Sequence, residues 1–102
     1  MKITTGVVLF LLGAAGAWAQ KDAEDLYLAK CSVCHGPDGT AKTAKGRKLK
    51  MKDVHQVLPK MGAEEMIKIV TDGKGTDMDA FSKEFNKDQI KALVEYYRSL
   101  GK

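Results

Sequence analysis

The chain has 102 residues, with 17 lysines and arginines against 13 aspartates and glutamates. This length suggests a single domain. The positive excess is modest and dispersed, which argues against nucleic-acid binding and favours partners with acidic surfaces or anionic lipid headgroups. With only two cysteines and two histidines, the composition also argues against a structural zinc site, which usually needs four nitrogen or sulfur ligands.

Residues 1–19 have the organisation of a signal peptide. Lys2 precedes an apolar run, and Ala17-Trp18-Ala19 has the small-x-small form of a cleavage site. We expect cleavage after Ala19, a single mature domain of residues 20–102 and a periplasmic location. The alternative is a membrane anchor formed by an uncleaved leader, although the uncharged run is at the short end for spanning a bilayer.

Residues 22–30 are predicted to form the first helix, with Asp22 as its N-cap. Its apolar positions recur at helical spacing and lead into the first cysteine: Ala23, Leu26, Tyr27 and Cys31. The turn sequence Gly36-Pro37-Asp38-Gly39 should end the helix.

The segment Cys31-Ser32-Val33-Cys34-His35 reads C-x-x-C-H, the attachment signature of a c-type haem. Cysteines three apart on a helical turn can each form a thioether with one vinyl group, and His35 then supplies an axial imidazole to the iron. A thioredoxin-like pair needs a βαβ context, which is not found around Cys31. A disulfide between the two cysteines would not need His35. We predict one covalent haem c, with its iron, attached through Cys31 and Cys34.

The segment 40–52 is rich in positive charge: Lys42, Lys45, Arg47, Lys48, Lys50 and Lys52. It is either a solvated loop or a docking patch beside the haem. Leu49, the large apolar residue in its middle, is predicted to contact the porphyrin. Next, Asp53 should cap a short helix over residues 54–58. His55 is a second candidate iron ligand, but a surface position is favoured because a bis-histidine site would leave Met78 unexplained.

A third helix should begin at residues 62–65 and end at Asp72-Gly73. Met78 follows in a loop whose glycines, Gly73 and Gly75, let the backbone bend close to a flat ligand. A thioether from this loop is well placed as the sixth iron ligand, opposite His35. The alternative is a gap-filling core methionine, and there are three rival methionines: Met51, Met61 and Met66.

Residues 86–100 are predicted to form the last helix, with Asn86 and Gln89 as a capping box. One apolar stripe runs along it: Ile90, Leu93, Val94, Tyr97 and Leu100. This stripe should cross the first helix near Ala23 and Tyr27.

Three segments together resemble the small class I cytochromes c of bacteria, including the cytochrome c6-like group. They are CSVCHGPDG at 31–39, GKGTDMDAF at 73–81 and IKALVEYYRSL at 90–100. The resemblance implies an all-α fold of three to four helices packed around one covalent haem, with the first and last helices crossing. It also implies thioethers at Cys31 and Cys34 and an axial pair formed by His35 and Met78.

The chain departs from this family at three places. Asp79 follows the methionine where many members have proline, and Gly46-Arg47-Lys48-Leu49 replaces a Gly-Pro-x-Leu segment. The only tryptophan, Trp18, lies in the leader. A lysine, Arg47 or Gln56 would therefore have to bind a haem propionate.

The sequence therefore predicts a soluble periplasmic one-electron carrier and not an enzyme. Methionine ligation favours ferrous iron and raises the reduction potential. The expected partners are redox proteins with acidic surfaces, including membrane oxidase or reductase complexes, and neither nucleic acid nor a small-molecule substrate. We expect a monomer. Two alternatives remain: a haem c subunit tethered to a membrane dehydrogenase or oxidase complex, and a peroxidase or ligand sensor with a labile Met78 between Asp77 and Asp79.

Overall fold

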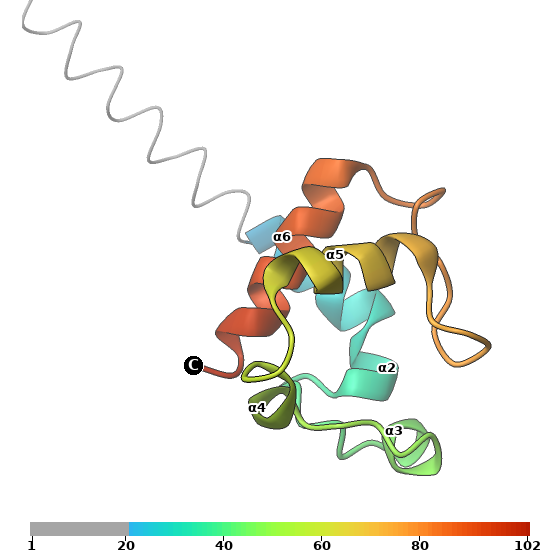
Figure 1. Ribbon diagram of the computed structural model, residues 1–102, viewed down its shortest axis with the longest axis vertical. Coiled ribbons are helices and arrows are strands. Elements are labelled where there is room, and N and C mark those ends of the chain that lie inside the picture. The colour runs from blue at the N-terminus through green and yellow to red at the C-terminus, as the bar shows by residue number, and fades with distance from the viewer. Residues whose placement is uncertain (1–20) are drawn as a thin grey trace, which may run out of the picture.

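The computed structural model describes residues 21–102, and the predicted signal peptide lies outside them. Residues 21–30 are helical. Five further helices follow in chain order (Figure 1): α2 Ser32–His35, α3 Ala44–Lys48, α4 Val54–Val57, α5 Ala63–Asp72 and α6 Lys87–Ser99. In this part of the chain the only β pairing is one isolated bridge, between Lys74 and Met78. No helix within it is long and apolar enough to cross a membrane.

The first helical segment and α2 follow one another with only a single turn residue between them. The Cys31 N–H donates to the Tyr27 carbonyl at 2.8 Å, and the His35 N–H donates to the Cys31 carbonyl at 3.0 Å. Gly36, at φ +83°, ends α2. The predicted helix over residues 22–30 is therefore confirmed, but Asp22 as its N-cap is wrong, because Lys21 is already helical.

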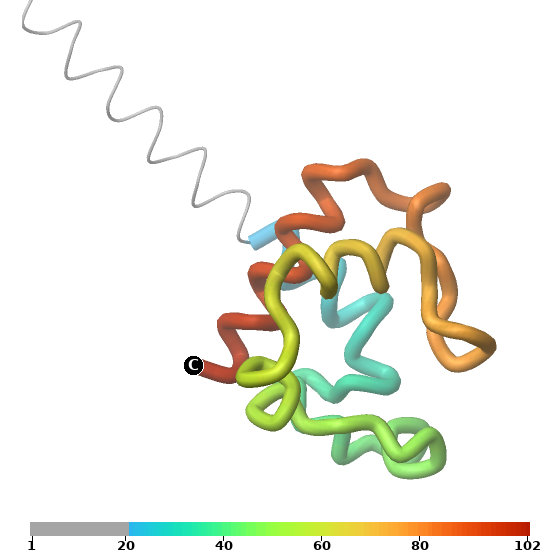
Figure 2. Tube along the Cα trace, viewed as in Figure 1, coloured from blue at the N-terminus to red at the C-terminus, as the bar shows by residue number. Residues whose placement is uncertain are grey.

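The core lies where this first segment crosses α6 (Figure 2). The ring of Tyr27, only 1% exposed, has its centroid 5.2 Å from that of Tyr96 and 6.4 Å from that of Tyr97. Phe85, Ile90 and Leu93 complete the buried cluster around it. The expected crossing of the first and last helices is thus present.

The two long C-terminal helices begin where the sequence predicts. Asn86 and Gln89 form both bonds of the capping box, since each side chain accepts from the other residue's N–H, at 2.8 Å and 2.9 Å. Helix α5 begins after Gly62 and ends at Gly73. These boundaries were predictable because local hydrogen bonds and glycines set them.

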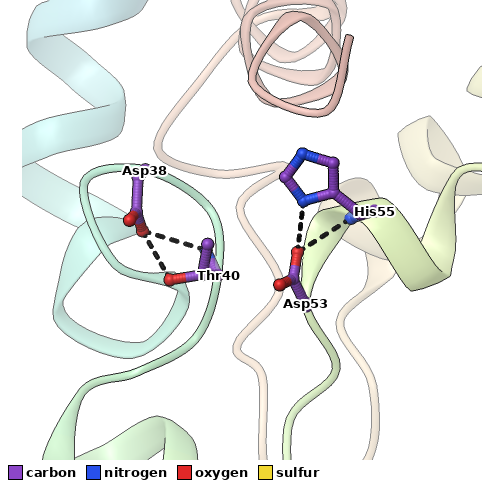
Figure 3. Close-up of polar contacts among 4 residues, drawn as sticks. All are labelled: Asp38, Thr40, Asp53 and His55. Carbon is purple, nitrogen blue, oxygen red and sulfur yellow. Dashed lines mark hydrogen bonds and ion pairs between the residues drawn. The ribbon is translucent and has the colours of Figure 1, made fainter.

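Segment 36–61 forms the end of the molecule below α5 and α6 in Figure 1. Two aspartates organise its backbone (Figure 3): Asp38 accepts from the Thr40 N–H and hydroxyl, and Asp53 accepts from the His55 N–H and ring. The bonds from Thr40 lower the pKa of Asp38, and those from His55 lower the pKa of Asp53. Asp53 therefore caps α4 as predicted.

Helix α3 was not predicted, because segment 40–52 was expected to be a charged loop. Its N-cap is Thr43, whose hydroxyl accepts from the Gly46 N–H at 2.9 Å. Gly46 lies against the backbone of other segments. A Cβ added there would come within 2.5 Å of the Ala41 carbonyl oxygen and 2.6 Å of the Cys34 carbonyl oxygen. Only glycine lets α3 approach α2 this closely.

Gly46→Ala should therefore lower the free energy of unfolding by about 1–3 kcal/mol, although alanine has the higher helix propensity. Main-chain carbonyls cannot rotate away from the added methyl group, so α3 must move. Urea denaturation of the purified protein measures the change. Gly62→Ala is the control, because nothing lies within 4 Å of its added Cβ. Equal midpoints for the two variants would contradict this role of Gly46.

Candidate functional site

A cavity of about 390 Å³ lies between the first helical segment, helices α5 and α6, and segment 49–61. Cys31 and His35 line one part of it, and Met78 lines another, from the loop that follows α5. Three of the four predicted haem-site residues therefore share one cavity. The fourth, Cys34, lies half-buried on α2 and is not among the lining residues.

His35 is placed on the cavity wall by α2, and burial lowers the pKa of its imidazole. Its Nδ1 atom is buried and has no hydrogen-bond partner in the part of the chain that the structure describes. The edge of the ring instead packs against Tyr97, with centroids 5.3 Å apart at an angle of 63°. A neutral imidazole beside a cavity is the form of histidine that binds metal ions.

Both cysteines are free thiols. Burial, reinforced by the neighbouring Cys34, raises the pKa of the Cys31 thiol to about 11. Before any covalent attachment, Cys31 is therefore a protonated, half-buried thiol at neutral pH rather than an exposed reactive thiolate. Cys31 is the N-cap of α2 and Cys34 lies within it, and Val33 between them is 65% exposed.

All four methionines of residues 21–102 line the cavity: Met51, Met61, Met66 and Met78. Proximity alone thus does not single out Met78, which sequence reasoning had separated from its rivals by the glycines of its loop. Met66 is only 5% exposed within α5, as expected of a core residue. His55 does not line the cavity; its exposed side chain bonds Asp53 at 2.7 Å, so the favoured surface position is confirmed.

The family model described as cytochrome c oxidase, cbb3-type, subunit III matches residues 19–96. The chain belongs to this family. A curated relative, the Cbb3-type cytochrome c oxidase subunit FixP of Azorhizobium caulinodans, is 27% identical over 85 residues, which are 81% of this chain. This chain spans only 28% of the length of that relative.

Two solved structures are also similar to this c-type cytochrome. The KustC0563 c-type cytochrome has a TM-score of 0.72 and 29% identity, and a Tyr-to-Phe mutant of the same protein has 0.70 and 28%. Each alignment covers 78% of this chain and 98% of the other. The all-α cytochrome c fold is thus confirmed, and the cofactor is a covalently bound haem c. Membership of the cytochrome c6-like group stays a prediction.

The residues around the cavity fit this cofactor. The thiol of Cys31, a buried imidazole with an unpaired nitrogen and several thioethers line a mostly apolar cavity, and a second thiol, that of Cys34, lies three residues after Cys31. Leu49, predicted to contact the porphyrin, is half-buried and lines the cavity. Sulfur and imidazole donors of this kind suit haem iron.

Polar side chains also line the cavity of this cytochrome. Gln56, predicted as a candidate for a haem propionate, is among them, whereas Arg47 is not. Three lysines of segment 49–61 join Gln56: Lys50, Lys52 and Lys60. The sequence showed only a run of positive charge, because charge density does not reveal which side chains face inward.

The loop that carries Met78 is closed at its base. The Lys74 N–H donates to the Met78 carbonyl at 2.9 Å, and the Met78 N–H donates to the Lys74 carbonyl at 3.3 Å. Gly73, at φ +83°, lies directly against this base: an added Cβ would come within 2.8 Å of the Met78 carbonyl oxygen and 2.9 Å of the Ala80 nitrogen. The backbone of Met78 is therefore held by contacts that only glycine permits.

Gly73→Ala should displace Met78 and weaken the near-infrared ferric absorption band that methionine–iron ligation produces. The added methyl group would clash with backbone atoms of the loop, and the positive φ of residue 73 is unfavourable for alanine. Gly75→Ala is the matched control, because Gly75 also has a positive φ, +58°, but nothing lies within 4 Å of its added Cβ. Equal band intensities in the two variants would show that contact with Gly73 does not position Met78.

Proposed function

We propose that this c-type cytochrome is a soluble, monomeric one-electron carrier of the periplasm, and not an enzyme. Its haem would be attached through Cys31 and Cys34 and ligated by His35 and Met78. The observation that carries the proposal is the placement of Cys31, His35 and Met78 around one cavity. The bound haem supplies the redox chemistry, since its iron has stable ferrous and ferric states.

The residues of the chain would ligate the iron and exclude water from it. His35 would bind the iron from a helix end, and Met78 would bind it with a soft thioether that favours ferrous iron. Leu93 and Val94, each 3% exposed, form part of an apolar wall that excludes water. Charge changes inside such a wall need little solvent rearrangement, which suits repeated transfer of a single electron.

Ligation by both His35 and Met78 also favours a carrier over a peroxidase or ligand sensor. Those activities need an axial position that opens readily. The bridge between Lys74 and Met78 and the packing against Gly73 restrain the loop of the sixth ligand. Asp79 is exposed and Asp77 lies on the cavity wall, so both carboxylates flank this loop. Binding of exogenous ligands to the ferric wild type would favour the peroxidase or sensor over the carrier.

A second candidate function is a haem c subunit of a membrane oxidase complex. The family description and the similarity to FixP favour it. An uncleaved leader would supply the membrane tether. Membrane fractionation and the mass of the mature protein separate the two candidates, because a carrier cleaved after Ala19 is recovered in the soluble fraction.

The distribution of charge supports acidic redox partners. Residues 40–60 contain seven lysines and arginines and one aspartate, whereas residues 61–102 contain seven basic and eight acidic residues. The basic segment includes α3 and α4 and lines the cavity through Lys50, Lys52 and Lys60. Positive charge beside the redox centre would raise the rate of encounter with an acidic partner.

The central experiment is optical spectroscopy of the purified holoprotein and its variants. In the wild type, the haem should resist acid–acetone extraction and the ferric form should show the methionine–iron band. Cys31→Ala should leave at most one thioether and a poorly matured protein, and His35→Ala should abolish the normal iron site. Met78→Ala should remove the band, lower the potential and admit exogenous ligands.

Met51→Leu and Met61→Leu are the controls for this set, because leucine keeps an apolar body of similar volume on the cavity wall. Both should keep the band. Retention of the band in Met78→Ala, or its loss in Met61→Leu, would move the sixth ligand to another methionine. Normal maturation of both Cys31→Ala and His35→Ala would overturn the proposed attachment site.

Electrostatic docking predicts a salt-dependent rate. Oxidation of the ferrous protein by hexacyanoferrate(III), a small anion, should slow as ionic strength rises. Reversing two exposed charges in α3, Lys45→Glu with Lys48→Glu, should slow it by several-fold at low salt. Stopped-flow measurements provide these rates. Lys91→Glu with Lys87→Glu, in α6, makes the same change of net charge away from segment 40–60, and equal slowing in both pairs would count against a localised docking surface.

A further inference from the structure

The carbonyls of the two residues next to His35, Cys34 and Gly36, each accept a hydrogen bond from a side-chain hydroxyl. The Cys34 carbonyl, on the N-terminal side, accepts from the Thr43 hydroxyl at 2.8 Å. The Gly36 carbonyl, on the C-terminal side, accepts from the Tyr27 hydroxyl at 2.7 Å and from the Gly39 N–H at 3.1 Å. Cys34 lies in the last turn of α2 and Gly36 is its C-cap, so both carbonyls lie at a helix end and accept from donors outside α2.

The Tyr27 hydroxyl makes a contact that the packing of its ring in the core does not require. Its ring already packs against Tyr96 and Tyr97, so phenylalanine would fill the same space. What the hydroxyl adds is a buried bond across nine residues to Gly36. Burial raises the pKa of Tyr27 far above its ordinary value, so the hydroxyl stays protonated and remains a donor.

Thr43 makes a matching connection from the other side. Its hydroxyl donates to Cys34 and at the same time accepts from the Gly46 N–H at 2.9 Å. One oxygen atom thus joins the beginning of α3 to the residue before His35. The close approach of Gly46 to Cys34 keeps the two helices within reach of this bond.

The imidazole has no such bond of its own. Nδ1 of His35 has no partner among residues 21–102, and its ring meets Tyr97 only through an edge contact. The orientation of the ring therefore depends on how the surrounding backbone is held. The His35 carbonyl accepts from the Ala41 N–H at 2.7 Å. Thr43 and Tyr27 supply the side-chain bonds to the carbonyls of the two neighbouring residues.

We propose that Thr43 and Tyr27 are positioning residues for His35, whose ring orientation and electrostatic surroundings they set through the Cys34 and Gly36 carbonyls. This inference rests on the proposed role of His35 as an iron ligand. Each hydroxyl also offsets the partial negative charge of a carbonyl next to the residue proposed to bind the iron. Removing either donor leaves that charge less compensated, which favours ferric iron and lowers the reduction potential.

The test compares Tyr27→Phe and Thr43→Val with the wild-type holoprotein. In each variant, the equilibrium constant for reduction by a common mediator should fall by about twofold to tenfold, the range expected from one hydrogen bond. The proton NMR shifts of the ferric haem methyl groups should rearrange, because they report the plane of the axial imidazole. Circular dichroism and thermal melts record folding separately.

Two conservative variants are the controls. Thr43→Ser keeps the hydroxyl and should restore wild-type potential and NMR shifts. Tyr96→Phe removes a hydroxyl from the same aromatic group, but one that makes no hydrogen bond within the described residues, and should change neither. Lower melting temperatures with unchanged potential and shifts in both test variants would overturn the inference, as would failure of Thr43→Ser to restore them. A wild type without covalent haem or histidine ligation would instead refute the proposed function.

Discussion

The packing of Tyr27 against α6 is the contact on which the rest of the structure depends. Tyr27 lies one helical turn before Cys31 and two turns before His35, so its burial also fixes the rotation of the segment that carries them. With Tyr27 facing Tyr96 and Tyr97, Cys31 and His35 line the cavity. A core contact and a cofactor site are therefore set by one helical register.

The cavity combines an apolar interior with charged residues in its wall. Ile69, Val70, Leu93 and Val94 line it from α5 and α6, while the lysines that line it from segment 49–61 belong to the basic part of the chain. An apolar interior strengthens electrostatic interactions around a redox centre. The proposed ligands, the imidazole of His35 and the thioether of Met78, are neutral and would add no charge there.

The sequence predicted those features that depend on neighbouring residues. The Asn86 capping box, the Asp53 cap and the glycine after α5 involve residues one to four apart, and each was confirmed. Helix α3 was missed because Gly46 is required by contact with Cys34, which lies twelve positions earlier and cannot be identified from local pattern. Asp22 does not cap the first helix, because Lys21 before it is already helical. Four methionines line the cavity. Their separation along the sequence does not give their distances from His35 in the folded chain, so sequence alone could not rank them as ligands.

The uneven placement of charge has a consequence that net charge alone does not convey. Residues 21–39 carry two basic and four acidic residues, whereas residues 40–60 carry seven basic residues and one acidic residue. The molecule therefore has a permanent dipole moment with its positive pole at the α3–α4 end. Near a negatively charged surface, the resulting torque turns that end, with its cavity-lining lysines, toward the surface before any atoms touch.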